Sequence, residues 1–158
     1  MLEVRQVELD VPSDDPGDRL HASAHAWAND SATDLTIEVV LSDGTHVEVT
    51  TPVAEPGPLI AMKLQAVMNR SVAKQGTDLQ DILRLTFDDQ TRPVALAQIG
   101  AVGDVVARDI AFHVDHWFVS KQPQALRWIR QSGGDDVTAD DLELVAELLG
   151  AAARRPTR

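Results

Sequence analysis

The sequence contains no cysteine, which excludes disulfide bonds, thiol catalysis and any zinc or iron–sulfur site built on cysteine. It also lacks an apolar run of about 18 residues, the length that a membrane-spanning helix needs. Its first residues do not show the basic and then apolar order of a signal peptide. We therefore expect a soluble, cytoplasmic protein that does not associate with membranes.

Basic residues are scarce. The chain has 14 Lys and Arg against 25 Asp and Glu, a net charge of −11, and residues 1–55 hold 12 acidic side chains but only Arg5 and Arg19. This balance argues against non-specific binding to nucleic acid, which needs a basic surface to release counterions. We interpret the acidic segment as a solvated surface, with a basic partner as the alternative.

Alternation of apolar and polar residues predicts three strands, at residues 2–9, 35–41 and 45–53. The segment Ser42-Asp43-Gly44 supplies the positive φ of a tight turn, so the last two strands should form a hairpin. Between the first two strands, residues 18–29 show the spacing of a helix. The chain thus begins with a β-containing segment, residues 1–55, that includes one helix.

After residue 56 the apolar spacing becomes helical. Pro123 should kink or split the longest of these segments, because proline lacks an N–H and clashes with the preceding turn. Strands followed by a helical bundle, residues 56–152, predict an α+β fold, and residues 153–158 should form a frayed tail. The predicted helices are 58–70, 77–87, 92–100, 104–131 and 138–152.

Two cations interrupt the apolar face of the first bundle helix. On a helical wheel Lys63 and Arg70 fall within the apolar arc, and Gln65 falls opposite. Charges on a buried face need partners, and the next helix offers Asp78 within its apolar face and Asp81 at the edge. The two helices should be adjacent and antiparallel, so these side chains should converge. Lys63 could then contact a phosphate while Asp78 or Asp81 orients it.

A structural explanation competes with this one. Thr77 followed by Gln80 has the spacing of a capping box, and acidic residues in a first turn complement the helix dipole. Asp78 and Asp81 could therefore mark a helix start, and Lys63 and Asp78 could be only a buried ion pair.

Residues 50–87 resemble part of a known family. The segments Lys63-Leu64-Gln65-Ala66 and Asp78-Leu79-Gln80-Asp81 are similar to the successive Lys-x-x-Ala and Asp-x-x-Asp motifs of AbiEii/AbiGii nucleotidyltransferase-like toxins of type IV toxin–antitoxin systems. The Leu-Ile-Ala-Met approach to Lys63 and the turn from Arg70 to Lys74 look similar too. The resemblance implies that Lys63 contacts nucleotide phosphate, that Asp78 and Asp81 support it, and that Arg70 is a second phosphate or carboxylate partner.

The resemblance also defines what this sequence lacks. In that family the helical half packs on a core of DNA polymerase β type, which transfers nucleotides from a nucleoside triphosphate with two Mg²⁺ ions held by acidic residues. That core carries a Gly-Ser turn and an Asp-x-Asp strand, and this sequence has neither. Glu3, Glu8 or Asp10 would be candidates for a third metal carboxylate. We therefore expect a C-terminal half that is inactive alone and has no cofactor of its own.

The alternative function is a non-enzymatic interaction module. Strand 2–9 and the acidic segment would then pair with a partner chain or a second copy. A zinc site on the pairs His21/His25 or His113/His116 ranks below both, because no third ligand is evident. Two further motifs receive structural interpretations: the segment Gly100–Gly103 is a helix–helix turn, and four aromatic residues should fill the bundle core, namely Phe112, Trp117, Phe118 and Trp128.

Overall fold

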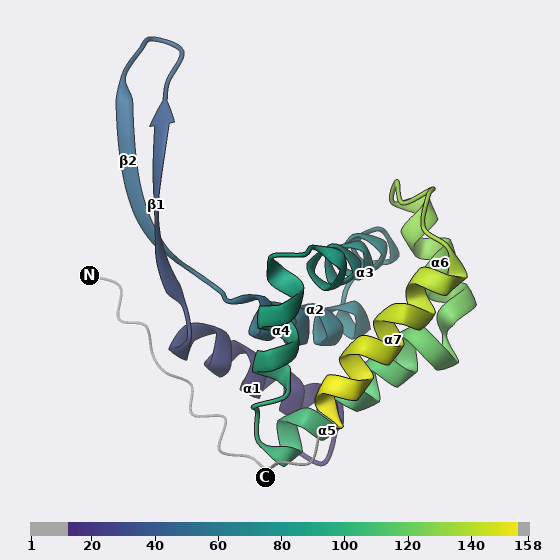
Figure 1. Ribbon diagram of the computed structural model, residues 1–158. Helices are drawn as coiled ribbons and strands as arrows, with labels where there is room; N and C mark the ends of the chain where they lie inside the picture. The colour runs from purple at the N-terminus through teal and green to yellow at the C-terminus, as the bar shows by residue number, and fades with distance from the viewer. Residues whose placement is uncertain (1–12, 155–158) are drawn as a thin grey trace.

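A computed structural model describes residues 13–154 of the chain. Figure 1 shows a body of packed helices from which a two-stranded hairpin projects. The predicted α+β class, with a hairpin followed by a helical bundle, is confirmed. The predicted strand 2–9, with its candidate carboxylates, and residues 155–158 of the predicted tail lie outside the described residues.

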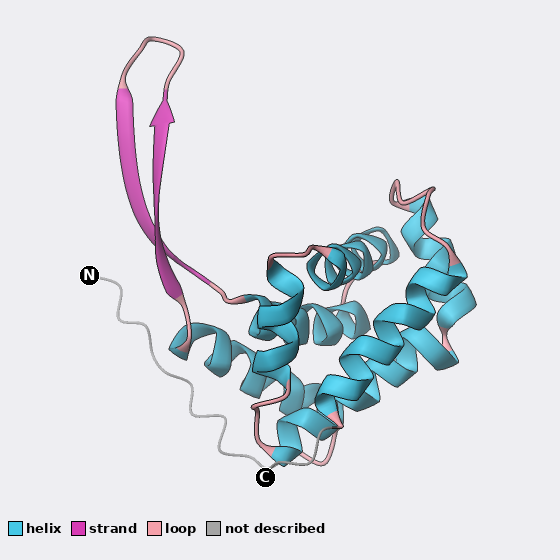
Figure 2. Cartoon of the chain, in the orientation of Figure 1, coloured by secondary structure: helices cyan, strands magenta, loops and turns pink. Residues whose placement is uncertain are grey.

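The two strands lie together in the hairpin, and the other elements belong to the helical body (Figure 2). Among residues 13–154, none of the helices combines the length and the apolar character that crossing a membrane requires. In chain order the elements are α1 (Pro16–Asp30), β1 (Thr33–Val40), β2 (His46–Val53), α2 (Pro56–Asn69), α3 (Val72–Phe87), α4 (Thr91–Ile99), α5 (Asp104–Val114), the π-helical segment η1 (Asp115–Ser120), α6 (Gln122–Gln131) and α7 (Ala139–Ala153).

Helix α1 shares the core of the helices that follow the hairpin. Asp15 caps it by accepting hydrogen bonds from two backbone N–H groups of the first turn, at 2.7 and 3.1 Å. Leu20 and Ala24 are fully buried. Arg19 donates two hydrogen bonds to the buried carboxylate of Asp109, at 2.6 and 2.9 Å, and so ties α1 to α5. The first helix is therefore part of the helical body.

The hairpin forms where the sequence predicts it. Gly44 has a φ of 83°, and the Gly44 N–H donates to the carbonyl of Leu41 at 2.9 Å. Glycine reaches this left-handed region without strain, which fixes the register of the two strands. Ile37 lies opposite Val49 at the centre of the antiparallel pair.

Helix α3 begins earlier than predicted, at Val72 instead of Thr77. The capping box predicted from Thr77 and Gln80 is therefore wrong. Thr77 lies inside the helix, where its hydroxyl donates to the carbonyl of Ala73 at 3.4 Å. The amide of Gln80 instead donates to the carbonyl of Ile129 on α6 at 3.0 Å. A helix start thus explains neither acidic residue of the candidate site.

Gly76 explains why the sequence predicted too late a start for α3. Glycine weakens a helix by about 1 kcal/mol relative to alanine, so its presence predicts a loop. Here α6 packs so closely that a Cβ at Gly76 would clash with the carbonyl oxygen of Trp128. Close helix packing keeps the glycine inside α3.

A capping box is present in the described chain at α7, where the side chains of Thr138 and Asp141 each accept a hydrogen bond from the other's backbone N–H.

Pro123 divides the long helix predicted over residues 104–131, as expected. Helix α5 continues into the π-helical segment η1, and α6 starts with Pro123 in its first turn. There the missing N–H of proline removes no helical hydrogen bond. Residues 100–103 form the turn between α4 and α5, which confirms the structural interpretation of the two glycines.

The aromatic residues of this region mostly fill the core. Trp117 and Phe118 are buried, and Trp128 packs against the core, as predicted. The prediction is wrong for Phe112, which is half exposed. Phe112 lines a surface cavity on that side of α5.

Candidate functional site

Helix α2 contacts four other helices, α1, α3, α4 and α5. Lys63 pairs with Asp78 and Val67 pairs with Gln75, which means that α2 and α3 run antiparallel as predicted. The candidate site lies along this pair of helices. Both helices contribute buried leucine and isoleucine side chains to the core.

The structure brings all four predicted site residues together. The Nζ atom of Lys63 donates to Oδ1 of Asp78 at 2.7 Å and to Oδ2 of Asp81 at 2.8 Å. The guanidinium of Arg70 lies 3.4 Å from Oδ2 of Asp78. One ammonium group therefore bridges two carboxylates, and a second cation approaches one of them from the end of α2.

Burial differs sharply across this cluster. The side chain of Asp78 is 2% exposed, those of Lys63 and Asp81 are 23% and 29% exposed, and that of Arg70 is 49% exposed. Burial opposes the charged form of Lys63, but the hydrogen bonds that its ammonium group donates to Asp78 and Asp81 outweigh burial and hold the pKa of Lys63 above its ordinary value. Lys63 is thus a fixed cation near neutral pH.

The cations of the cluster border a cavity of about 250 Å³. Lys63 and Arg70 belong to its lining, whereas Asp78 and Asp81 do not, so the carboxylates lie behind Lys63 as seen from the cavity. Six of the nine lining residues carry nitrogen in their side chains. The lining residues are His21, His25, Leu59, Met62, Lys63, Gln65, Ala66, Asn69 and Arg70.

Two histidines of α1 complete this wall. Their ring centroids are 4.4 Å apart. Nδ1 of His21 lies 3.2 Å from Oε1 of Gln65, and Nδ1 of His25 lies 2.7 Å from the carbonyl oxygen of His21. The sequence shows that His21 and His25 are four residues apart on a helix, but it does not show which residues pack beside them. Their role in the cavity depends on the packing of α1 on α2, which no local pattern reports.

The wheel prediction for Gln65 is wrong. The sequence places this residue opposite the apolar arc, yet its side chain is buried. Helix α1 covers that face of α2, and His21 supplies a polar partner. Arg70 also differs from its prediction, because it follows the last residue of α2 in an extended conformation and is exposed. Leaving the helix is what allows its guanidinium to reach both Asp78 and the cavity.

The residues present do not fit a pair of magnesium ions. In the described part of the chain no three His, Asp or Glu side chains are grouped as metal ligands. Asp78 and Asp81 already share the ammonium group of Lys63, whose positive charge opposes a cation at the same oxygens. His113 is one of the histidines considered above as a zinc ligand. It is fully buried, and burial lowers the pKa of its imidazole.

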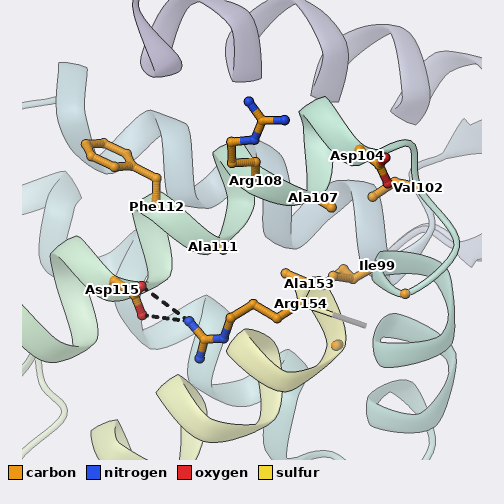
Figure 3. Close-up of a pocket in the computed structure, with 12 residues that line it drawn as sticks. Ile99, Val102, Asp104, Ala107, Arg108, Ala111, Phe112, Asp115, Ala153 and Arg154 are labelled. Atoms are coloured by element: carbon orange, nitrogen blue, oxygen red, sulfur yellow. Dashed lines mark hydrogen bonds and ion pairs between the residues drawn. The ribbon is translucent and has the colours of Figure 1, made fainter. Parts of the chain in front are cut away.

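A second and larger cavity, of about 530 Å³, lies between α5 and α7 (Figure 3). Four alanines and Ile99 belong to its wall, and Arg154 and Asp115 point toward each other at 3.3 Å. None of the predicted site residues lines it.

Fold and site together define an α+β protein with a cavity bordered by Lys63 and Arg70. No family model, no curated protein and no solved structure matches the chain. The similarity to AbiEii-type proteins therefore remains a prediction carried by residues 50–87.

Proposed function

We propose that this chain is a nucleotidyltransferase-related, AbiEii-like protein that binds the phosphate groups of a nucleotide in the cavity between α1 and α2. The observation that carries the proposal is the composition of the cavity wall. Two permanent cations, Lys63 and Arg70, and two histidines line it, and among the described residues no carboxylate does. Such a wall presents charged hydrogen-bond donors to an anion, and the carboxylates that offset their charge, Asp78 and Asp81, lie behind Lys63 and outside the wall.

The two cations would have different tasks. Lys63 is held in place by Asp78 and Asp81, so it presents a positioned point charge that needs little reorganisation when a phosphate arrives. Arg70 is half exposed, and its planar guanidinium can bind phosphate oxygens in bidentate fashion. Asp78 and Asp81 are therefore positioning residues, because they act through Lys63.

The size of the cavity limits what enters it. Pockets that enclose a whole ligand measure roughly 300–1,000 Å³, whereas this one measures about 250 Å³. It accommodates phosphate groups, with the sugar and base lying outside. This arrangement supports binding through the triphosphate and little selection among bases.

Binding is proposed without turnover by the chain alone. The sequence has no Gly-Ser turn and no Asp-x-Asp pair to hold the metal ions of nucleotidyl transfer. Asp78 and Asp81 cannot replace them while they hold Lys63. The proposed location is the cytoplasm, where nucleoside triphosphates are abundant.

Calorimetric titration with ATP, GTP, CTP and pyrophosphate tests the proposal, together with thermal unfolding in the same ligands. We expect binding of all four, and a loss of about tenfold or more in affinity for Arg70→Gln, because a charge-assisted hydrogen bond is removed. Arg84→Gln is the matched control. Arg84 is also an exposed arginine paired with an aspartate of α3, but it does not line the cavity. No binding by the wild type, or equal losses in both variants, would overturn the proposal.

A non-enzymatic interaction module remains the second candidate function. The observation that favours it is the projecting hairpin, whose apolar side chains are exposed. Strand 2–9, the surface first predicted for such pairing, lies outside the described residues.

A further inference from the structure

The hairpin presents two chemically different faces. In an antiparallel pair, directly opposed residues lie on the same face of the sheet, and successive residues along each strand lie on opposite faces. The register pairs Ile37 with Val49 and Val39 with Val47 on one face, and Glu38 with Glu48 on the other. One face is therefore apolar and the other is acidic.

The apolar face carries no charged side chain. Its exposed apolar residues are 37–51% exposed, although this alternating pattern is typical of a sheet with one buried side. They are Leu35, Ile37, Val39, Leu41, Val47, Val49 and Val53. In Figures 1 and 2 the hairpin extends away from the helices, which leaves this face uncovered by the helical body.

A two-stranded hairpin with an exposed apolar face needs another surface packed against that face. An isolated two-stranded hairpin is marginally stable in water at best, and independent stability requires further strands or packing on an apolar face. The seven side chains together expose on the order of 500 Å², a patch of the size that marks interaction sites on soluble proteins. The alternation of apolar and polar residues predicts one buried face, but the structure exposes it. The two agree if another surface packs against the apolar face of the hairpin.

We propose that this face packs against the same face of a second copy of the chain, forming a two-fold symmetric dimer of stacked hairpins. A face without charge is complementary to itself, as a two-fold interface requires. The acidic side chains Glu38 and Glu48 point to the outer sides of the stack, so the charges of the two copies do not meet. A basic partner would be drawn to the acidic face and would leave the apolar one exposed.

The buried area fits this occupant. Two copies together remove about 1,000 Å² from water, close to the lower limit for a specific interface. Joining two hairpins edge to edge would satisfy their open backbone groups but would leave both apolar faces in water. Face-to-face stacking is therefore the arrangement that accounts for the exposed side chains. The inference is independent of nucleotide binding, because the hairpin residues do not line the α1–α2 cavity.

The oligomeric state of Ile37→Asp and Thr36→Asp tests the inference, measured by light scattering and sedimentation equilibrium. The two residues are adjacent in β1 but lie on opposite faces. We expect a dimeric wild type, a dimeric Thr36→Asp, and a dissociation constant raised about 100-fold or more in Ile37→Asp, because two-fold symmetry places the new carboxylate in the interface twice. Unchanged helical circular dichroism in both variants verifies that the helical body is folded.

Crosslinking at introduced cysteines locates the interface. Because the chain has no cysteine, Val49→Cys and Thr50→Cys each give a single reactive thiol, one on each face. A bis-maleimide that spans the roughly 10 Å between stacked sheets should link Val49→Cys into a covalent dimer and leave Thr50→Cys monomeric. A wild-type monomer at about 100 µM, above the micromolar dissociation constants at the weak end for interfaces of about 1,600 Å², would overturn the proposal. So would a dimer that Ile37→Asp leaves intact, or preferential crosslinking at Thr50→Cys.

Discussion

Replacing Lys63 with methionine should destabilise the protein by about 3 kcal/mol. The variant keeps a long unbranched side chain but removes the ammonium group that Asp78 and Asp81 share. Asp78 is 2% exposed, so its carboxylate cannot regain water. Breaking a buried ion pair from one side typically costs about 3–5 kcal/mol. Arg70 remains 3.4 Å away and compensates in part, which places the expected loss at the lower end.

Urea unfolding followed by circular dichroism at 222 nm measures this loss. Asp81→Asn is the comparison, because it removes a contact to the same ammonium group from a residue that is 29% exposed, and it should cost about 1 kcal/mol or less. The double variant Lys63→Met/Asp78→Leu should recover much of the stability, since an apolar pair can replace a buried ion pair at little cost. A loss below about 1 kcal/mol for Lys63→Met, equal to that of Asp81→Asn, would refute the reasoning.

Two further predictions concern the helical body. Burial holds the pKa of His113 below its ordinary value, so the unfolded chain binds a proton that the folded chain does not as pH falls below about 6.5, and stability should decrease by up to about 1.4 kcal/mol per pH unit. Urea unfolding at pH 5–7 should show a shallower decrease for His113→Gln, and an unchanged slope would contradict this. Gly76→Ala should cost about 3 kcal/mol, because a Cβ would meet the Trp128 carbonyl, whereas Gly103→Ala, which meets nothing, should be nearly neutral in thermal unfolding.

The sequence predicted the parts of the site that follow from local spacing. A lysine within an apolar arc needs a buried partner, and the apolar spacing of the next helix identified Asp78 correctly. The start of α3 was missed because Thr77 and Gln80 match a capping box by spacing, while the packing of α6 on Gly76 decides the outcome. Local propensity had no access to that contact.

The cavity itself could not be predicted. Its two histidines come from α1 and its cations from α2 and the residue that follows it, so its existence depends on how two helices separated by the hairpin pack.

For the hairpin, in contrast, the local structure was predictable from the sequence but its surroundings were not. Alternation and the Asp43-Gly44 turn predicted the strands correctly, but the same alternation predicts one buried face, and that face is exposed. A pattern in sequence predicts that a surface is covered, but it does not identify what covers it.

The most direct test of phosphate binding between α1 and α2 is the histidine region of the NMR spectrum during titration with pyrophosphate and ATP. The chain has five histidines: His21 and His25 line the cavity, and His46, His113 and His116 do not. Binding at the proposed site should shift the signals of His21 and His25 in a saturable manner and leave the other three in place. Saturable shifts confined to His113 and His116, or none at any histidine, would contradict it.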